Sequence, residues 1–253
     1  MSETTASAQF ELLLPSEIRQ ALAQRSVVYV PLGTYEWHGE HLPVGLDGLT
    51  AHGLCLEAAR RAGGLVLPPL YYGTGGEHGA YPWTIIADAA EIRPLLLQTL
   101  ARMAAFDVGT VVILSGHFAS EQIDMIRKLE ADWLGSGERM RVRALAVSMA
   151  TGLALAPDHA ALFETTLLSA LWPDRLRIDL LPPLAEAPSI DPGGNEMGPH
   201  RHDPTHPLFG IFGPDPRRFD PASAAPLRDA MVDWLLAEVA AIESRPAGGA
   251  QTL

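Results

Sequence analysis

The chain of 253 residues carries a formal net charge of −12, so a polyanionic partner would meet net repulsion. No basic run offsets that charge, and no segment approaches 18 uncharged apolar residues, so neither nucleic acid nor membrane is an expected partner. Cys55 is the only cysteine, which excludes an intramolecular disulfide. We expect one cytoplasmic domain over 1–253, with its core at about 10–243 and a frayed tail from about 245.

Short apolar runs alternate along the chain with longer segments of helical periodicity. The expected strands are 27–32, 65–70, 110–115 and 142–147, and the expected helices are 48–61, 91–106, 120–134, 160–171 and 221–242. Such alternation is typical of a parallel sheet built through right-handed crossovers. The segment 182–221 breaks the pattern with many prolines and several glycines and histidines, and we interpret it as an ordered irregular excursion or a lid.

Polar clusters follow each of the four expected strands, at the edge of a parallel sheet where ligands usually bind. The sequences are GTYEWHGEHLPVGLDG, YYGTGGEHGAYPWT, SGHFASEQ and PDHAALFETT. They bring one set of candidate residues toward that edge: Glu36, His38, Asp47, His78, His117, His159 and Glu164.

The spacing of these residues indicates a metal site. Glu36 and His38 are two positions apart, so on an extended segment their side chains point to the same side. A mixed set of imidazoles and carboxylates suits Zn²⁺, Mn²⁺ or Fe²⁺ better than Ca²⁺. Simpler roles remain open at this point: Asp47 as a helix N-cap, His117 as a capping residue, Glu164 as a solvated helix carboxylate. Their occurrence together at one sheet edge favours the metal site.

The first cluster, with the strand before it, resembles the signature of the creatininase family. PLGTYEWHGEHLPVGLD has that family's strand end, its Glu-x-His-Gly-x-His-Leu-Pro run and its aspartate, and GEHGAYPWT, SGH and HAALFETT match later motifs in order. The similarity covers roughly 28–166, and GIFGPDPRRFDPA resembles a late family segment.

The resemblance implies a three-layer αβα fold and a metal-dependent amidohydrolase that uses two divalent ions, Zn²⁺ or Mn²⁺ with Fe²⁺ possible, on a small-molecule substrate. It implies a homo-oligomer, commonly a hexamer. It also implies catalytic roles for His159 and Glu164, and metal ligands at the following positions, with Asp47 as the bridge: Glu36, His38, Asp47, His117 and Glu164. Glu40 and His41 are then expected to orient the loop, with His41 exposed or hydrogen-bonded.

Several positions depart from the family pattern. Phe118 and Ala119 stand where many members have two glycines, and Ala119 also replaces a carboxylate of the creatininases proper, so creatinine is a doubtful substrate. Trp83 stands where glycine is usual, as a core residue or as a ring that narrows the pocket. We expect His78, Trp83 and Phe118 to contact the substrate.

Other functions are less well supported by the residues. The glycine-rich segment 73–79 lacks both the GxGxxG spacing and the lysine of a nucleotide-binding loop, and Cys55 lies in a helical segment as a small hydrophobic residue. Two alternatives to amide hydrolysis stay open: a hydrolase that opens a lactone or other carbonyl ring, and a catalytically silent metal-binding homologue.

Overall fold

The computed structural model describes residues 8–188 and 198–244. The expected tail and the middle of the proline-rich segment, 189–197, lie outside the described residues. Four parallel strands form one sheet in the order β2-β1-β3-β4. They are β1 Val27–Leu32, β2 Leu65–Val66, β3 Thr110–Ser115 and β4 Arg141–Ala146. The expected single α/β domain with a parallel sheet is therefore confirmed.

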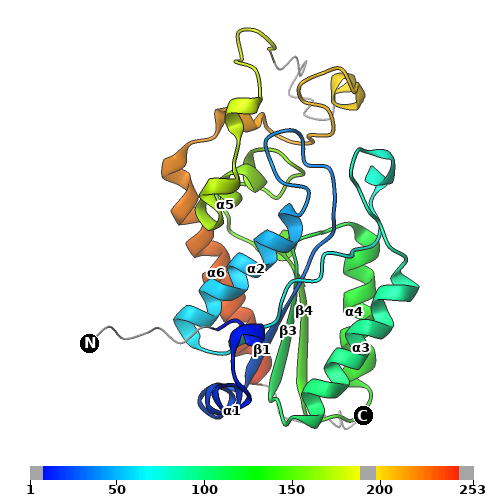
Figure 1. The fold of residues 1–253 in the computed structure, drawn as a ribbon, viewed down its shortest axis with the longest axis vertical. Helices are drawn as coiled ribbons and strands as arrows, with labels where there is room; N and C mark the ends of the chain where they lie inside the picture. Colours follow the sequence, from blue (N-terminus) through cyan, green and yellow to red (C-terminus); the bar gives the residue numbers. More distant parts are fainter. Residues whose placement is uncertain (1–7, 189–197, 245–253) are drawn as a thin grey trace.

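Helices cover both faces of the sheet (Figure 1). The helices are α1 Pro15–Gln24, α2 Leu46–Ala62, α3 Ala89–Ala105, α4 Ser120–Leu134, α5 Leu162–Leu171 and α6 Ala224–Glu243. On one face, Val27 and Tyr29 of β1 pack in a core with α2, α5 and α6. On the other face, Val28 and Val30 pack with α3 and α4. The alternation of side chains along a strand produces these two cores.

Two of the expected boundaries differ from the structure for local reasons. Strand β2 ends at Val66 because Pro68 and Pro69 lack the N–H groups that a sheet needs, although Leu70 still makes an isolated parallel bridge to Leu32. Helix α5 begins at Leu162 rather than at residue 160, because Ala160 has a left-handed φ of 57°.

Helix α1 is absent from the expected elements. Pro15 occupies its first turn, and the Glu17 carboxylate accepts a hydrogen bond from the Leu14 N–H at 2.7 Å. Both are helix-start signals. Cys55 in α2 is wholly buried, and burial raises the pKa of its thiol, in keeping with a hydrophobic role.

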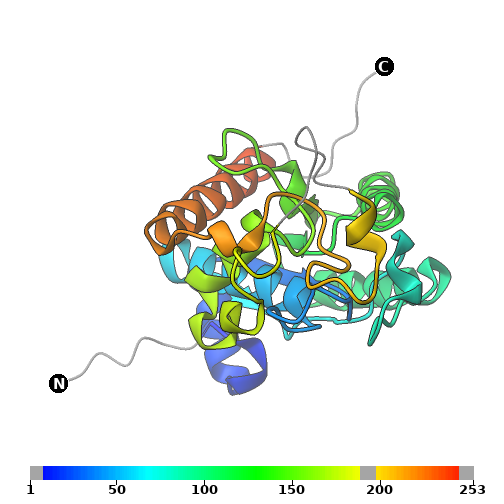
Figure 2. The same cartoon turned by 90° about the horizontal axis from the view of Figure 1, so that it is seen from above.

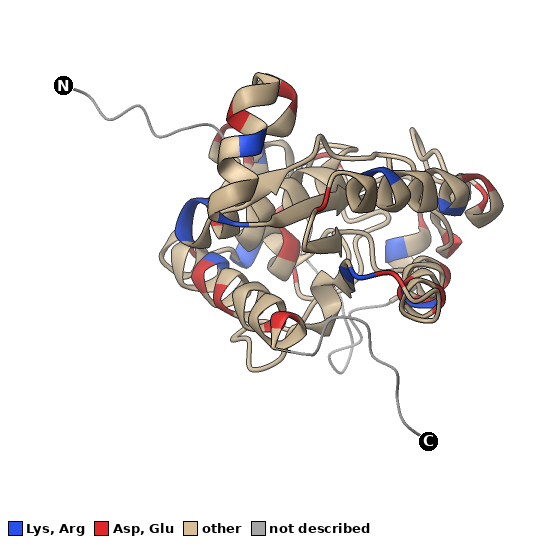
Figure 3. Ribbon diagram, turned by 90° about the horizontal axis from the view of Figure 1, so that it is seen from below, with Lys and Arg blue, Asp and Glu red and all other residues tan. Residues whose placement is uncertain are grey.

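The carboxyl edge of the sheet is covered by irregular chain (Figure 2). The described parts of 182–221 form turns and short 3₁₀ helices, such as Pro199–His202 and Pro216–Arg218, as expected for a proline-rich excursion. None of the described helices is both long and apolar enough to cross a bilayer. Acidic and basic positions are interspersed along the described helices (Figure 3), in surface pairs such as Arg93–Asp132.

Candidate metal centre and active site

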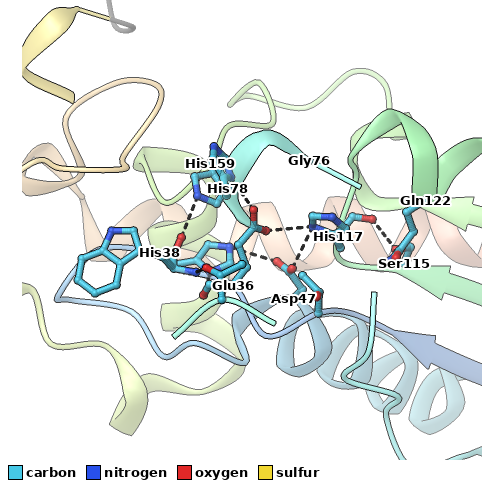
Figure 4. A network of polar contacts seen from close by, with 12 residues as sticks. Glu36, His38, Asp47, Gly76, His78, Ser115, His117, Gln122 and His159 are labelled. Carbon is cyan, nitrogen blue, oxygen red and sulfur yellow. Dashed lines mark hydrogen bonds and ion pairs between the residues drawn. The ribbon is translucent and has the colours of Figure 1, made fainter. Parts of the chain in front are cut away.

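A cavity of about 140 Å³ lies at the carboxyl edge of the sheet, where four loops meet. Figure 4 shows the polar network around it. All of the candidate residues except His38 contribute directly to its lining, which consists of Glu36, Asp47, Gly76, His78, His117, Phe118, Ala119, His159 and Glu164. His38 lies immediately behind this wall, within 3.6 Å of Glu164.

The segment that follows β1 directs the side chains of Glu36 and His38 into the site and the side chain of Trp37 away from it, toward Phe209. Glu36 and His38 are each 1% exposed. The His38 Nδ1–H donates to the Glu36 backbone carbonyl at 2.9 Å, which fixes the ring. The Trp37 indole Nε1–H instead donates to the Phe209 carbonyl at 2.9 Å. The Nε2 atom of His38 is therefore the atom available as a ligand.

Asp47 lies inside the first turn of α2, and Gly45 is the N-cap of that helix. The alternative that Asp47 is the N-cap is therefore wrong. Two glycines allow the helix start to approach the strand ends. A Cβ on Gly33 would lie 2.1 Å from the Gly48 nitrogen, and one on Gly116 would lie 2.0 Å from the Asp47 carbonyl oxygen. Any side chain at either position would push the Asp47 carboxylate away from the loops.

The two carboxylate oxygens of Asp47 face two different groups of ligands. Its Oδ2 lies 3.3 Å from His117 Nδ1, which is also 3.0 Å from Glu36 Oε2. Its Oδ1 lies 3.2 Å from His38 Nε2, which is 3.6 Å from Glu164 Oε2. Each of the two triads, Glu36–Asp47–His117 and His38–Asp47–Glu164, offers ligand atoms within 4.8 Å of one another.

The charges and unsatisfied atoms of the triads fit a pair of cations. Burial opposes protonation of His38, but the Asp47 and Glu164 carboxylates raise its pKa to about 10. Burial likewise opposes protonation of His117, whose pKa rises to about 10 beside Asp47 and Glu36. The site therefore favours positive charge at both positions. Among the described residues, His38 Nε2 and Asp47 Oδ2 are buried and make no hydrogen bond, as expected of atoms that serve as metal ligands.

The pKa values of the two glutamates, Glu36 and Glu164, shift in opposite directions. Burial alone would raise the pKa of Glu36, but hydrogen bonds from His117 and His78 hold it well below its usual range. Burial, with Asp47 and Asp158 nearby, raises the pKa of Glu164. Glu164 is 4% exposed, and its Oε2 accepts the Ala160 N–H at 2.6 Å, so the alternative of a solvated carboxylate is wrong.

His159 is held by three hydrogen bonds. Its ring Nε2 lies 2.9 Å from the Trp37 carbonyl oxygen. A carbonyl only accepts, so Nε2 carries the proton and Nδ1 keeps its lone pair. The His159 backbone pairs in both directions with Phe212, at 2.9 and 2.8 Å. Burial and the neighbouring His38 lower the pKa of His159 to about 3, so the ring is neutral near pH 7. His159 also forms a third possible ligand group, with Glu36 and His38.

The three expected substrate contacts are placed differently from one another. His78 donates from Nδ1 to Glu36 Oε1 at 2.5 Å, and its ring stacks on Phe212 with centroids 5.4 Å apart. Phe118 lines the cavity. Trp83 is 77% exposed and is not part of the cavity lining, so it is neither a core residue nor a wall of this cavity.

His41 is buried and hydrogen-bonded, and Glu40 is exposed. The His41 Nε2 lies 3.1 Å from Thr165 Oγ1, and burial lowers the pKa of His41 to about 3. His41 thus joins the loop after β1 to α5 through Thr165, and it is hydrogen-bonded rather than exposed, which is one of the two situations expected for it. His117 is not a helix cap, because Ala119 is the N-cap residue of α4.

Two supporting residues were missed by the sequence reasoning. Gln122, wholly buried on α4, donates to Ser115 Oγ at 2.7 Å and accepts the Thr74 N–H at 2.8 Å, so it joins the end of β3 to the loop that carries His78. Asp158 accepts the N–H groups of Phe163 and Glu164 at 2.8 and 3.3 Å and so caps α5. The sequence signal for Asp158 was its place just before an apolar helix; Gln122 had no such signal.

Comparison with known proteins identifies relatives of this site. Residues 12–239 match the family described as "Creatininase: Creatinine amidohydrolase". The mycofactocin precursor peptide peptidase of Mycobacterium ulcerans (strain Agy99) is 32% identical over 184 residues, which cover 66% of this chain and 69% of the relative. The creatinine amidohydrolase of Pseudomonas putida is 26% identical over 216 residues, 76% of this chain and 75% of the relative.

Solved structures share the fold. A creatinine amidohydrolase (creatininase) superposes with a TM-score of 0.74 at 21% identity, over 96% of this chain and all of that one. A structure named "Creatininase Mn" and a mutant creatininase of Zn-Zn type, each 21% identical, cover 95% of this chain and 99% of theirs, with TM-scores of 0.73 and 0.71. The match to the family along most of the chain confirms the resemblance found in the motifs. The chain belongs to the creatininase family of hydrolases.

Proposed function

We propose that this protein hydrolyses a C–N bond of a small amide, cyclic amide, formamide or short peptide with the help of two divalent cations. The observation that carries the proposal is the Asp47 carboxylate, whose two oxygens lie 3.2 and 3.3 Å from histidines of two separate triads. A single carboxylate shared in this way is suited to bridge two cations. A helix cap or an isolated ion pair would need only one of those oxygens.

The residues divide into two ligand groups. Glu36, His117 and one oxygen of Asp47 would hold one cation, and His38, Glu164 and the other oxygen would hold the second. These nitrogen and carboxylate ligands, with no thiolate among them, suit Zn²⁺ or Mn²⁺, with Fe²⁺ also compatible. When bound, two such cations supply an activated water and polarise the substrate carbonyl.

His159 is the group that would move the proton. Its Nε2–H donates to the Trp37 carbonyl, so Nδ1 would accept the proton that the attacking water loses and would deliver it to the leaving nitrogen as the C–N bond breaks. Since burial and the neighbouring His38 lower the pKa of His159 and keep the ring neutral, the Nδ1 lone pair is free to accept that proton near pH 7. Glu164 contacts residues on both sides of His159: its Oε2 lies 3.6 Å from His38 Nε2 and accepts the Ala160 N–H at 2.6 Å.

The lining of the cavity favours a small amide other than creatinine as the substrate. The carboxylates that line the cavity are Glu36, Asp47 and Glu164, and all three are assigned to the cations. Ala119 lines the cavity at the position where a creatininase carboxylate is expected. Bond cleavage at an amide is the chemistry that the names of both curated relatives share. His78 and Phe118 line the cavity, which supports a role for both in contacting the substrate. We further propose a cytoplasmic homohexamer.

Metal analysis combined with turnover tests the proposal. Purified protein should contain up to two divalent transition ions per chain, lose hydrolysis on chelation and regain it with Zn²⁺ or Mn²⁺. A panel of linear amides, cyclic amides, formamides, dipeptides and lactones then separates C–N hydrolysis from lactone opening and from a silent homologue. Full turnover after verified removal of metal would refute the mechanism, and turnover of lactones alone would refute the substrate class.

A further inference from the structure

The segment 198–213, which we call the strap, contains a completely buried arginine. Arg201 is 0% exposed, although its guanidinium is among the groups most costly to remove from water. Its Nη1 donates to the Ile211 carbonyl at 2.8 Å and its Nη2 donates to the Gly213 carbonyl at 3.2 Å. The planar guanidinium thus grips two carbonyls of one short stretch of backbone.

Phe212 lies between those two carbonyls and turns the opposite way. Its N–H donates to the His159 carbonyl at 2.8 Å, and its own carbonyl accepts the His159 N–H at 2.9 Å. The backbone of 211–213 therefore alternates, with carbonyls 211 and 213 toward Arg201 and residue 212 toward His159. Gly213 has a φ of 136°, and a Cβ there would lie 2.7 Å from the Asp158 Cβ, so the stretch fits tightly against the start of α5.

This arrangement connects the strap to the ring of His159. The paired backbone sets where the His159 Cα lies, and the ring must then reach the Trp37 carbonyl at 2.9 Å. The Phe212 ring continues the contact, with its centroid 5.4 Å from His78 and 6.1 Å from His159. A shift of the 211–213 backbone would therefore move both histidines.

We propose that Arg201 is a positioning residue, which fixes the Phe212–His159 backbone pair and through it the His159 ring. The proposal rests on the proposed catalytic role of His159. Arg201 acts on His159 through the strap, since the Ile211 and Gly213 carbonyls that accept from it flank Phe212, and its Nε also donates to His200 Nε2 within the strap at 3.1 Å. Misplacement of a catalytic group by about 1 Å can lower turnover by up to about 100-fold.

Arg217 provides a matched control in the same part of the fold. Its side chain is also nearly buried, 5% exposed, and it too grips two carbonyls, those of Pro182 and Ala187, at 2.9 and 2.8 Å. Those carbonyls lie outside the stretch 211–213. Arg217→Met therefore removes a nearly buried arginine, together with its ion pair to Asp215 at 2.7 Å, without loss of the grip on Phe212.

The experiment compares Arg201→Met, Arg201→Lys and Arg217→Met in the full, metal-loaded chain, by kinetics, metal content and residue-resolved amide hydrogen exchange. We expect Arg201→Met to lower kcat about 10- to 100-fold with KM and metal content little changed, and to speed exchange of the Phe212 and His159 amides at least about 10-fold. Arg201→Lys, which keeps the charge and can donate to a carbonyl, should recover part of both. Arg217→Met should keep kcat within about threefold and leave those two amides protected.

The outcomes are distinguishable. Wild-type protection of the two amides in Arg201→Met, or an equal loss of kcat in Arg217→Met, would overturn the positioning role. If Arg201→Met does not fold, Arg201→Lys must show the partial losses, and wild-type behaviour of that variant would overturn the proposal. Absence of hydrolysis by the wild type would refute the proposed function, while the exchange comparison would still decide whether Arg201 holds the Phe212–His159 pair.

Discussion

The replacement Asp47→Asn tests the central feature of the site, a carboxylate shared between two triads. The amide keeps the shape of the side chain but has no negative charge and one oxygen in place of two. Asp47 lies with one oxygen 3.2 Å from His38 Nε2 and the other 3.3 Å from His117 Nδ1. The variant therefore loses the bridge to one triad whichever way the amide turns.

The magnitudes follow from the position of Asp47 in α2. Gly45 is the N-cap, so no cap energy is at stake, and the favourable interaction of a first-turn carboxylate with the helix dipole is worth about 0.3–1 kcal/mol. We expect the helix start itself to lose no more stability than this; the remaining loss comes from the broken pairing with His38 and His117 and from the linkage to bound metal. Metal content should fall to one ion per chain or fewer, and kcat should fall at least about 10²-fold, as when a group that stabilises transition-state charge is removed.

The assay measures metal per chain, kcat and thermal unfolding for Asp47→Asn and for Asp124→Asn. Asp124 lies exposed on α4, so its asparagine variant should keep both ions and full turnover. Retention of two ions and near-normal turnover by Asp47→Asn would refute the bridging role and would move it to another carboxylate.

Four further predictions test other parts of the site and the assembly. His159→Gln should lower kcat by about 10²-fold or more with metal content unchanged, whereas loss of an ion would make His159 a ligand. His41 has a pKa of about 3 in the folded chain against 6.5 in the unfolded chain, so its contribution to stability is complete above about pH 6.5 and is lost as pH falls toward 3. His41→Gln, which can still bond Thr165, should therefore reduce the stability that is lost between pH 7 and pH 5 by about 2 kcal/mol. Denaturant titrations at the two pH values measure this loss, and an unchanged dependence of stability on pH would contradict the prediction. Creatinine turnover should be weak compared with the best amide, because Ala119 replaces a carboxylate; robust creatinine hydrolysis would show that this position matters little. Light scattering should give a hexamer, and a monomer mass at micromolar concentration would exclude it.

The sheet was predictable because its strands are apolar on both faces. β1 and β3 match the expected ranges fully, since VVYVPL is bounded by Ser26 and Gly33, and TVVILS by Gly109 and Gly116. β2 and α1 were less accessible to pattern reasoning. Pro68 and Pro69 shorten β2 although the run around them is apolar, and α1 has no fully buried residue to impose a clear hydrophobic period.

The site residues were predictable where the spacing in the sequence determines which way a side chain points. They were not predictable where tertiary packing determines it. Glu36 and His38 face the same site because an extended segment alternates, so two positions of sequence were enough to pair them. Trp83 shows the limit of that reasoning. Its neighbours in sequence lie near the site, but Trp83 has a left-handed φ of 60° and is 77% exposed, which no periodicity indicates.

The glycines at the strand ends show why the remaining geometry required a structure. Gly33 and Gly116 follow strands that are far apart in the sequence, yet both lie against the first turn of α2. A Cβ atom added at either glycine would lie 2.0 to 2.1 Å from backbone atoms of that turn, so neither position accepts a side chain. Their role depends on a contact between three separate segments, and a glycine at the end of a strand is equally common in an ordinary turn. Because these two glycines determine how deeply Asp47 enters the site, replacing either by alanine would displace the carboxylate without changing any ligand. The position of the bridge is therefore set by the packing of backbone on backbone, while its chemistry is set by Asp47 itself.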